Sequence, residues 1–207
     1  MAPSLPLERP YLRQMRFQQM RPRVWSSGFT IIELLMVMAI IAIISAVALP
    51  KIDFSRYRID AGVRSLASGL ALAQRRAVTN QSNVNVLFDV TNKTFKIHED
   101  ENNDNVIQPA ERVRQYPIGE GLEYGVGTAP TRTYTPAPVT FTRQLGGLPE
   151  IIFRRDGSAS ENGAIYITSK NASSTGRTKD ARSVELIQAT GRVEWYRYTG
   201  AAWQRKF

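Results

Sequence analysis

Four oxygen-bearing side chains recur at fixed spacing in the segment DENNDNVIQPAE. Asp100, Asn102 and Asp104 occupy its first, third and fifth positions, and Glu111 occupies the twelfth. Hard oxygen donors at these positions wrap a calcium ion, and the late glutamate closes the loop around it. Asn105 occupies the sixth position, where glycine is usual, and asparagine also adopts a positive φ. The segment predicts a calcium site without the helices of an EF-hand. The alternative is a solvated acidic hairpin tip that binds no ion.

Residue types that support catalysis are scarce. The chain has 207 residues and no cysteine, which excludes disulfides and cysteine-ligated metal sites. His98 is the only histidine, so a Ser-His-Asp site or a histidine-rich metal site is not expected. No glycine-rich phosphate loop is visible, and Asp156-Gly157 is a turn signal. The sequence therefore predicts a protein that is not an enzyme, with no cofactor apart from the calcium ion.

The whole chain has a net charge of +9. In its last third, basic residues are interleaved with aromatic residues. Arg177, Lys179 and Arg182 lie in one polar segment, and Arg192 lies in a later strand pattern beside several tyrosines and tryptophans. Such a mixture suits contacts to phosphates and stacking on bases. These four residues are candidate nucleic-acid contacts. The alternative is a solvated basic surface over strand aromatics that pack in the core.

An apolar run of 21 residues, Phe29 to Leu49, contains a single acid, Glu33. At about 1.5 Å per residue a helix over this run would be about 31 Å long, which matches the hydrocarbon core of a membrane. A charge at bilayer depth costs roughly 2.5–3.5 kcal/mol or more. A plain anchor has no use for such an acid, whereas a helix that packs against copies of itself could pair it with a cation.

A basic segment precedes the apolar run. Its charged residues are five arginines and one glutamate, Arg9, Arg13, Arg16, Arg21, Arg23 and Glu8. By the positive-inside rule this segment stays in the cytoplasm and the rest of the chain crosses the membrane. The apolar run is longer than the core of a secretory signal peptide.

Elements that could position these residues follow from the hydrophobic periodicity. After Pro50, apolar residues recur at steps of four and three up to about Thr79, which predicts an amphipathic helix continuous with the apolar run. From Asn83 onward the pattern changes to strands, with Thr128 to Pro149 expected as a long loop holding one short strand at Val139–Thr142. The fold class is α+β: a long N-terminal helix followed by an antiparallel β-rich domain.

The string Gly28-Phe29-Thr30-Ile31-Ile32-Glu33 resembles the processing site of type IV prepilins. The resemblance implies cleavage after Gly28 by a prepilin peptidase, which then methylates the new amino terminus at Phe29. It also implies that Glu33 of one subunit pairs with the Phe29 amine of a neighbour in a helical assembly. Pro50 lies 21 residues after Phe29, where many pilins carry a helix-bending proline.

The resemblance divides the chain into four parts: a cleaved leader 1–28, a transmembrane or filament-core helix 29–49, its amphipathic continuation 50–80, and a β-rich domain 81–207. The leader is long for this class. Met15 and Met20 are candidate internal starts beside Met1, and we expect translation to begin at Met20 with the short leader MRPRVWSSG.

The C-terminal half resembles the GspH/FimT family, through the stretches IIFRRDGSAS, AIYIT and VELIQATGRVEWY. Members are minor pseudopilins of type II secretion and minor pilins of type IV pili, with a long helix and two packed antiparallel sheets. The family implies a single-pass inner-membrane protein with a cytoplasmic leader and a periplasmic domain, which then enters a filament at its tip or in its initiation. Its partners would be the peptidase, other pilins or pseudopilins, and the assembly machinery.

The sequence is compatible with two further functions. Some FimT-like pilins capture DNA through a GRxR stretch, and the matching residues here are Gly191-Arg192-Val193-Glu194. Glu194 replaces the second arginine and would repel phosphate. A membrane-anchored periplasmic binding domain that never assembles is the other alternative.

Overall fold

The structure is a computed structural model that describes residues 28–48 and 54–206. The chain divides into two units, one ending at Lys51 and one beginning at Ile52, and each is described by itself. The leader predicted over 1–28 lies, apart from Gly28, outside the described residues, and so do Met15, Met20 and Pro50.

In the first unit a single helix is described, α1 (Ile31–Ala48). Its apolar side chains are exposed around the whole helix, among them Ile31, Leu34, Met38, Ile41 and Ile44. A helix that is apolar on every side needs an apolar environment from outside itself. No helix in the described part of the chain combines the length and hydropathy required to cross a membrane.

The second unit is built on α2 (Ser55–Asn80), which buries one face. The buried residues follow the predicted spacing of four and three, and comprise Ile59, Gly62, Val63, Leu66, Leu70, Ala73 and Ala77. Gln81 ends the helix in a left-handed conformation, with φ of 55°. The predicted continuity of α1 and α2 depends on residues 49–53, which lie outside the described part.

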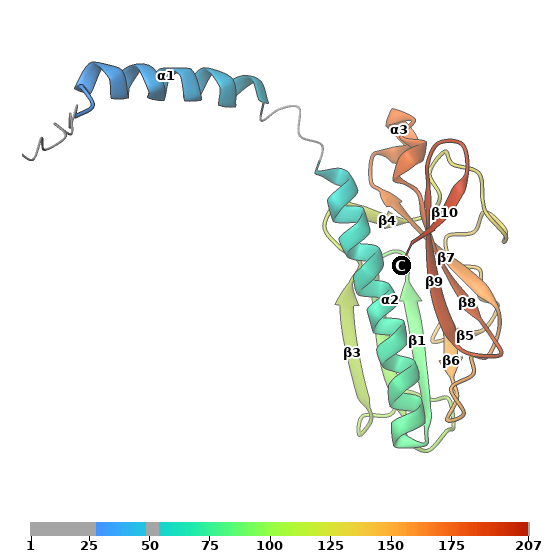
Figure 1. The fold of residues 1–207 in the computed structure, drawn as a ribbon. Coiled ribbons are helices and arrows are strands. Elements are labelled where there is room, and N and C mark those ends of the chain that lie inside the picture. Colours follow the sequence, from blue (N-terminus) through green and yellow to red (C-terminus); the bar gives the residue numbers. More distant parts are fainter. Residues whose placement is uncertain (1–27, 49–53, 207) are drawn as a thin grey trace, which may run out of the picture. The chain divides into compact units, whose positions relative to one another are not determined.

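Two five-stranded antiparallel sheets pack with α2 (Figure 1). The first has the order β3-β2-β1-β6-β5, formed by β1 (Asn83–Asp89), β2 (Thr94–Asp100), β3 (Arg112–Pro117), β5 (Gln144–Leu145) and β6 (Leu148–Phe153). The second has the order β10-β9-β8-β7-β4, formed by β4 (Leu122–Tyr124), β7 (Gly163–Ser169), β8 (Arg182–Ile187), β9 (Arg192–Tyr198) and β10 (Trp203–Lys206).

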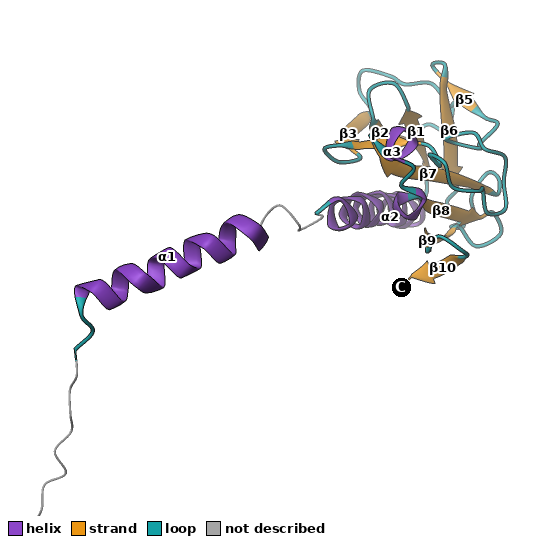
Figure 2. Ribbon diagram, turned by 90° about the horizontal axis from the view of Figure 1, so that it is seen from above, coloured by secondary structure: helices purple, strands orange, loops and turns teal. Residues whose placement is uncertain are grey.

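One hydrophobic core joins the helix to the inner faces of both sheets. Figure 2, which looks nearly along α2, shows strands of both sheets beside the helix. Alternate strand residues enter this core, such as Val84, Val86 and Phe88 on β1, and Ile165 and Ile167 on β7. The predicted α+β class, with a helix followed by two antiparallel sheets, is confirmed.

Several element predictions were wrong in detail. Val139–Thr142 is not a strand, because only Val139 forms a single bridge, to Ile165. The predicted loop instead contains a hairpin of β5 and β6 around Gly146 and Gly147, whose φ values are 59° and 77°. Two positive φ values suit a two-residue hairpin turn. The polar segment from Ser169 to Arg182 contains a short helix, α3 (Ala172–Thr175), and a 3-10 turn, η2 (Thr178–Asp180).

Candidate functional site

The predicted processing segment lies immediately before α1. Gly28, Phe29 and Thr30 precede the helix and are exposed, with Phe29 82% exposed. The Thr30 hydroxyl accepts the N–H of Glu33 at 3.2 Å, and the Thr30 carbonyl accepts the N–H of Leu34 at 3.1 Å. Thr30 is therefore the N-cap of α1.

Glu33 occupies the third position of this helix, and its backbone N–H is the group that the Thr30 hydroxyl caps. Threonine followed three residues later by glutamate, just before an apolar run, is the signature of a capping box. A negative side chain in the first turn also suits the helix dipole. The pattern was visible in the sequence, and any test of Glu33 in assembly has to separate its charge from this capping position.

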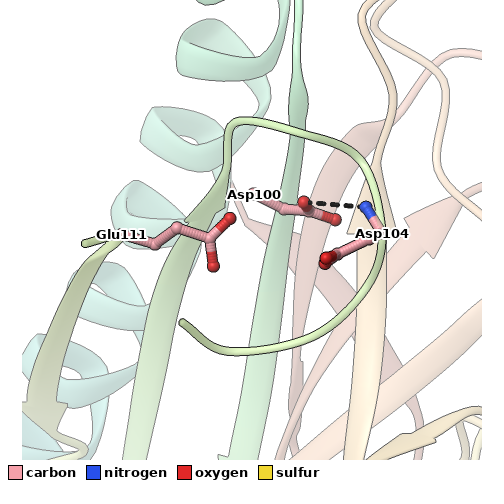
Figure 3. A group of neighbouring side chains, drawn as sticks. All are labelled: Asp100, Asp104 and Glu111. Carbon is pink, nitrogen blue, oxygen red and sulfur yellow. Dashed lines mark hydrogen bonds between the residues drawn. The ribbon is translucent and has the colours of Figure 1, made fainter. Parts of the chain in front are cut away.

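The acidic loop between β2 and β3 brings together three of its four predicted ligands (Figure 3). Asp100 is the last residue of β2, and Glu111 immediately precedes β3. One carboxylate oxygen from each of Asp100, Asp104 and Glu111 lies within 4.8 Å of the others. Asn102, the fourth predicted ligand, donates its side-chain N–H to Asp104 at 2.9 Å.

Backbone hydrogen bonds fold this loop around the Asp100 side chain. The Asp100 carboxylate accepts the N–H groups of Asp104 at 3.1 Å and of Asn105 at 2.9 Å. Asn103 and Asn105 both adopt left-handed conformations, with φ of 60° and 58°. Asn105 thus takes the positive φ expected of it in place of glycine.

Buried side chains of the first sheet anchor the loop. His98 Nε2 lies 2.7 Å from Glu111, and Asn85 donates to the Asn105 side-chain oxygen at 2.8 Å. Asn105 in turn donates to Glu150 at 3.3 Å. The hydrogen bonds from His98 and from the Gln108 backbone N–H lower the pKa of Glu111 below its ordinary value. The arrangement holds an ionised Glu111 in place.

The structure does not bring the four predicted nucleic-acid contacts together. Arg182 is fully buried and donates to Asp60 at 2.7 Å and to the Lys179 carbonyl at 2.8 Å. Burial lowers the pKa of Arg182, and the hydrogen bond from its guanidinium to Asp60 opposes that shift. The prediction that Arg182 contacts a nucleic acid is wrong for this fold, because its guanidinium faces the protein interior.

Arg192 is exposed but already paired. It lies 3.2 Å from Glu194, which also lies 2.8 Å from Arg205 and accepts the Tyr196 hydroxyl at 2.7 Å. Arg192 pairs in register with Ile187, five residues along β8 from Arg182. At about 3.3 Å per residue, Arg192 is roughly 16 Å from Arg182 along the sheet. Glu194 therefore offsets part of the positive charge where the GRxR resemblance would place DNA.

Lys179 and Arg177 lie instead among basic residues near the start of α2. Arg56, Lys179 and Arg197 line a pocket of about 130 Å³ with Tyr198 and Thr199. Arg58, Lys170 and Arg177 line a second pocket, of about 200 Å³, which also includes Glu120. The two arginines of α2 that line these pockets, Arg56 and Arg58, come from the segment SRYR, and nothing in the sequence pattern connects this segment with the later loop.

Comparisons with known proteins agree with the N-terminal and C-terminal resemblances. Residues 26–49 match the model of the prokaryotic N-terminal methylation motif, and residues 62–187 match that of the type II transport protein GspH. No curated protein matches the chain.

Two solved structures are similar to the chain at low identity. The minor pseudopilin EpsH of the Vibrio cholerae type 2 secretion system is 15% identical, with a TM-score of 0.44, over 70% of this chain and 99% of EpsH. The type IV minor pilin FimU of Pseudomonas aeruginosa (strain PAO1) is 14% identical, with a TM-score of 0.43, over 73% of this chain and 96% of FimU. The GspH match alone spans more than half of the 207 residues and lies C-terminal to the methylation motif, and the chain therefore belongs to the GspH family of pilin-like proteins.

Proposed function

We propose that this chain is a minor pseudopilin that is cut after Gly28, methylated on Phe29 and assembled through α1 into the pseudopilus of a type II secretion system. The observation that carries the proposal is the order of the two matched segments, a methylation motif at 26–49 and a GspH domain at 62–187. The first segment supplies a processing site and an apolar helix. The second supplies a folded domain for the filament surface.

Assembly would give α1 the apolar environment that it lacks by itself. Before assembly the inner membrane supplies this environment, with the leader in the cytoplasm and the domain in the periplasm. In a filament the α1 helices of neighbouring subunits supply it. Cleavage after Gly28 creates a cationic amine at Phe29, and Glu33 of an adjacent subunit would compensate it. A charge that is costly in lipid thereby favours docking in register.

The chain acts in this scheme as the substrate of a prepilin peptidase and methyltransferase, not as an enzyme. Its partners are other pseudopilins and the machinery that drives extraction from the membrane. As a minor subunit it would initiate the filament or occupy its tip. A type IV pilus remains the alternative machine.

Two variants separate the charge of Glu33 from its capping position. Glu33→Gln removes the charge but keeps a side chain that is accepted at this position of a capping box. Thr30→Ala removes the capping hydroxyl but keeps the charge. We expect both variants to be processed, with mass spectrometry detecting N-methylated Phe29 at the mature terminus. We expect only Glu33→Gln to be lost from the sheared filament fraction.

Three results would contradict this scheme. Normal filament incorporation of Glu33→Gln would show that the charge is dispensable, and equal loss of both variants would assign the effect to the cap. A mature protein that retains residues before Phe29 would instead support a membrane-anchored periplasmic domain that does not assemble.

A DNA-binding minor pilin is the second candidate, and the basic pockets near the start of α2 favour it. Arg56, Lys179 and Arg197 line one of these pockets, and three such cations suit contact with phosphates. A gel shift at 50 mM salt tests this candidate, with Lys179→Ala and Arg197→Ala expected to weaken binding and Arg192→Ala expected to leave it unchanged. Absence of a shift for the unaltered protein would eliminate DNA binding.

A further inference from the structure

We propose that the loop between β2 and β3 binds one calcium ion through Asp100, Asn102, Asp104 and Glu111. The site does not depend on the proposed function, because its residues and contacts lie within the second unit.

The first support is convergence of the donors. Calcium–oxygen distances are about 2.3–2.6 Å, so two ligands on opposite sides of one ion lie roughly 5 Å apart. The carboxylate oxygens of Asp100, Asp104 and Glu111 lie within 4.8 Å of one another. One ion can therefore reach all three with little movement of the backbone.

The second support is an acceptor atom without a donor. The Glu111 side chain is only 5% exposed, and its Oε2 accepts hydrogen bonds from His98 and from the Gln108 N–H. Its Oε1 is buried and has no hydrogen-bond partner in the described part of the chain. Figure 3 shows this carboxylate pointing toward Asp100 and Asp104. A buried carboxylate oxygen is costly unless a donor or a cation meets it, so this atom points to a missing ligand.

The third support is the local charge. His98 contacts Asn85 through Nδ1 at 3.4 Å and Glu111 through Nε2 at 2.7 Å. Within the described residues, no lysine or arginine forms an ion pair with Asp100, Asp104 or Glu111. In the described part of the chain, His98 is thus the basic side chain that contacts these three carboxylates, and it contacts only Glu111.

The chemistry of the donors selects the ion. All of them are oxygens, spaced along a twelve-residue loop that also places Gln108 at the ninth position, where a ligand often acts through water. In the structure the amides of Asn102 and Gln108 donate to the same Asp104 oxygen, at 2.9 and 2.6 Å. Calcium would replace these donors at Asp104, and the two amides would turn their oxygens toward the ion.

Titration calorimetry on the full-length, chelator-treated protein in detergent tests the site, with calcium chloride as the probe. We expect one ion per chain, with a Kd of about 10⁻⁴–10⁻³ M, as in extracellular calcium modules. Asp104→Asn should weaken binding by roughly tenfold or more, because it removes a charged ligand. Glu101→Gln is the matched control. Glu101 is exposed in the same loop, but it occupies the second position, between two predicted ligands, so loss of its charge should change the Kd less than about twofold.

Thermal unfolding supplies the second measurement and a check on folding. Asp104 is exposed, so Asp104→Asn should unfold at the same temperature as the unaltered protein when a chelator is present. Calcium should raise the unfolding temperature of the unaltered protein and of Glu101→Gln, but not that of Asp104→Asn. If Asp104→Asn is misfolded, Asn102→Ala takes its place, again with weaker binding expected.

Any of three results would overturn the proposal. The first is that the unaltered protein gives no heat of binding with calcium up to millimolar concentration. Asp104→Asn could bind as tightly as Glu101→Gln. Magnesium could bind with the same affinity as calcium, which would remove the assignment of the ion.

Discussion

Arg182 shows at the scale of a single residue why charge alone does not predict a binding site. It was predicted as a nucleic-acid contact, yet it is fully buried and paired with Asp60 on α2. The strand β8 that contains it is buried on both faces over Arg182–Leu186. An alternation of exposed and buried positions is therefore missing, and the sequence pattern cannot say which way the guanidinium points.

Asp60→Ala should destabilise the fold by leaving the Arg182 guanidinium buried without its ion-pair partner. Breaking a buried pair costs about 3–5 kcal/mol, and because Asp60 is 23% exposed on its side chain we expect roughly 2–3 kcal/mol. Urea unfolding measures this difference. The double variant Asp60→Ala, Arg182→Met should recover part of the loss, since it removes the unpaired charge as well.

Glu120→Ala, at an exposed acid, is the control and should change the free energy of unfolding by less than about 0.5 kcal/mol. If Asp60→Ala cost no more than this control, the ion pair would not matter to stability.

The candidate calcium loop shows the opposite case, in which residue spacing was informative. The alternate donors and the late glutamate predicted which carboxylates would lie close together, and Asp100, Asp104 and Glu111 do so. The sequence did not indicate that His98 would hold Glu111 from an adjacent strand. That contact depends on the pairing of β2 with β3, which brings Glu111 back beside a residue 13 positions earlier.

At the scale of the element, α2 depends on glycine where it meets the sheets and their connecting loop. Gly62 and Gly69 look in the sequence like weak points of a helix. In the structure a Cβ on Gly62 would collide with the Ile118 carbonyl oxygen and with Leu122, and one on Gly69 would lie 2.7 Å from the Phe95 ring. Both glycines therefore permit a close approach that any side chain would block.

Gly62→Ala should destabilise the protein despite the higher helix propensity of alanine. The obstacle at Gly62 is partly a backbone carbonyl, which cannot rotate away, so we expect a loss of about 1–3 kcal/mol, as is typical of overpacking. Ser65→Ala, on the exposed face of the same helix, is the control and should be neutral or slightly stabilising. Thermal unfolding of the two variants compares them directly, and an increase in stability for Gly62→Ala would refute the close-approach argument.

Periodicity predicted the long elements well and the short ones poorly. The spacing of four and three predicted for α2 agrees with the structure, because the helix buries one continuous face. The change to a strand pattern from Asn83 agrees as well, because alternate residues of β1 enter the core. The two-residue strand β5 has too few residues to show any period, and its only signal was the pair Gly146-Gly147. Strand β10 has only four residues and is held by contacts distant in sequence: it pairs with β9, and the Trp203 indole donates to the Pro130 carbonyl at 3.1 Å.

At the scale of the whole molecule, the two units differ in whether they satisfy their own apolar surface. The second unit encloses its core between α2 and two sheets. The helix α1 leaves its apolar side chains exposed on all sides, and in the proposed function lipid or other chains would cover them. The sequence could predict that difference, because it follows from composition alone, but not which machine receives the helix.

A deletion strain decides between the two machines, since the same apolar helix could enter either filament. From the proposed pseudopilin role we expect loss of secreted exoenzyme activity with normal twitching and normal DNA uptake. Complementation should succeed with the unaltered gene and with Thr30→Ala, but not with Glu33→Gln, which ties the phenotype to assembly and not to the bare presence of the protein. Loss of twitching or uptake with normal secretion would contradict a secretion role. That result would make the chain a minor pilin, and the pockets lined by Lys179 and Arg197 would then be the first surface to alter.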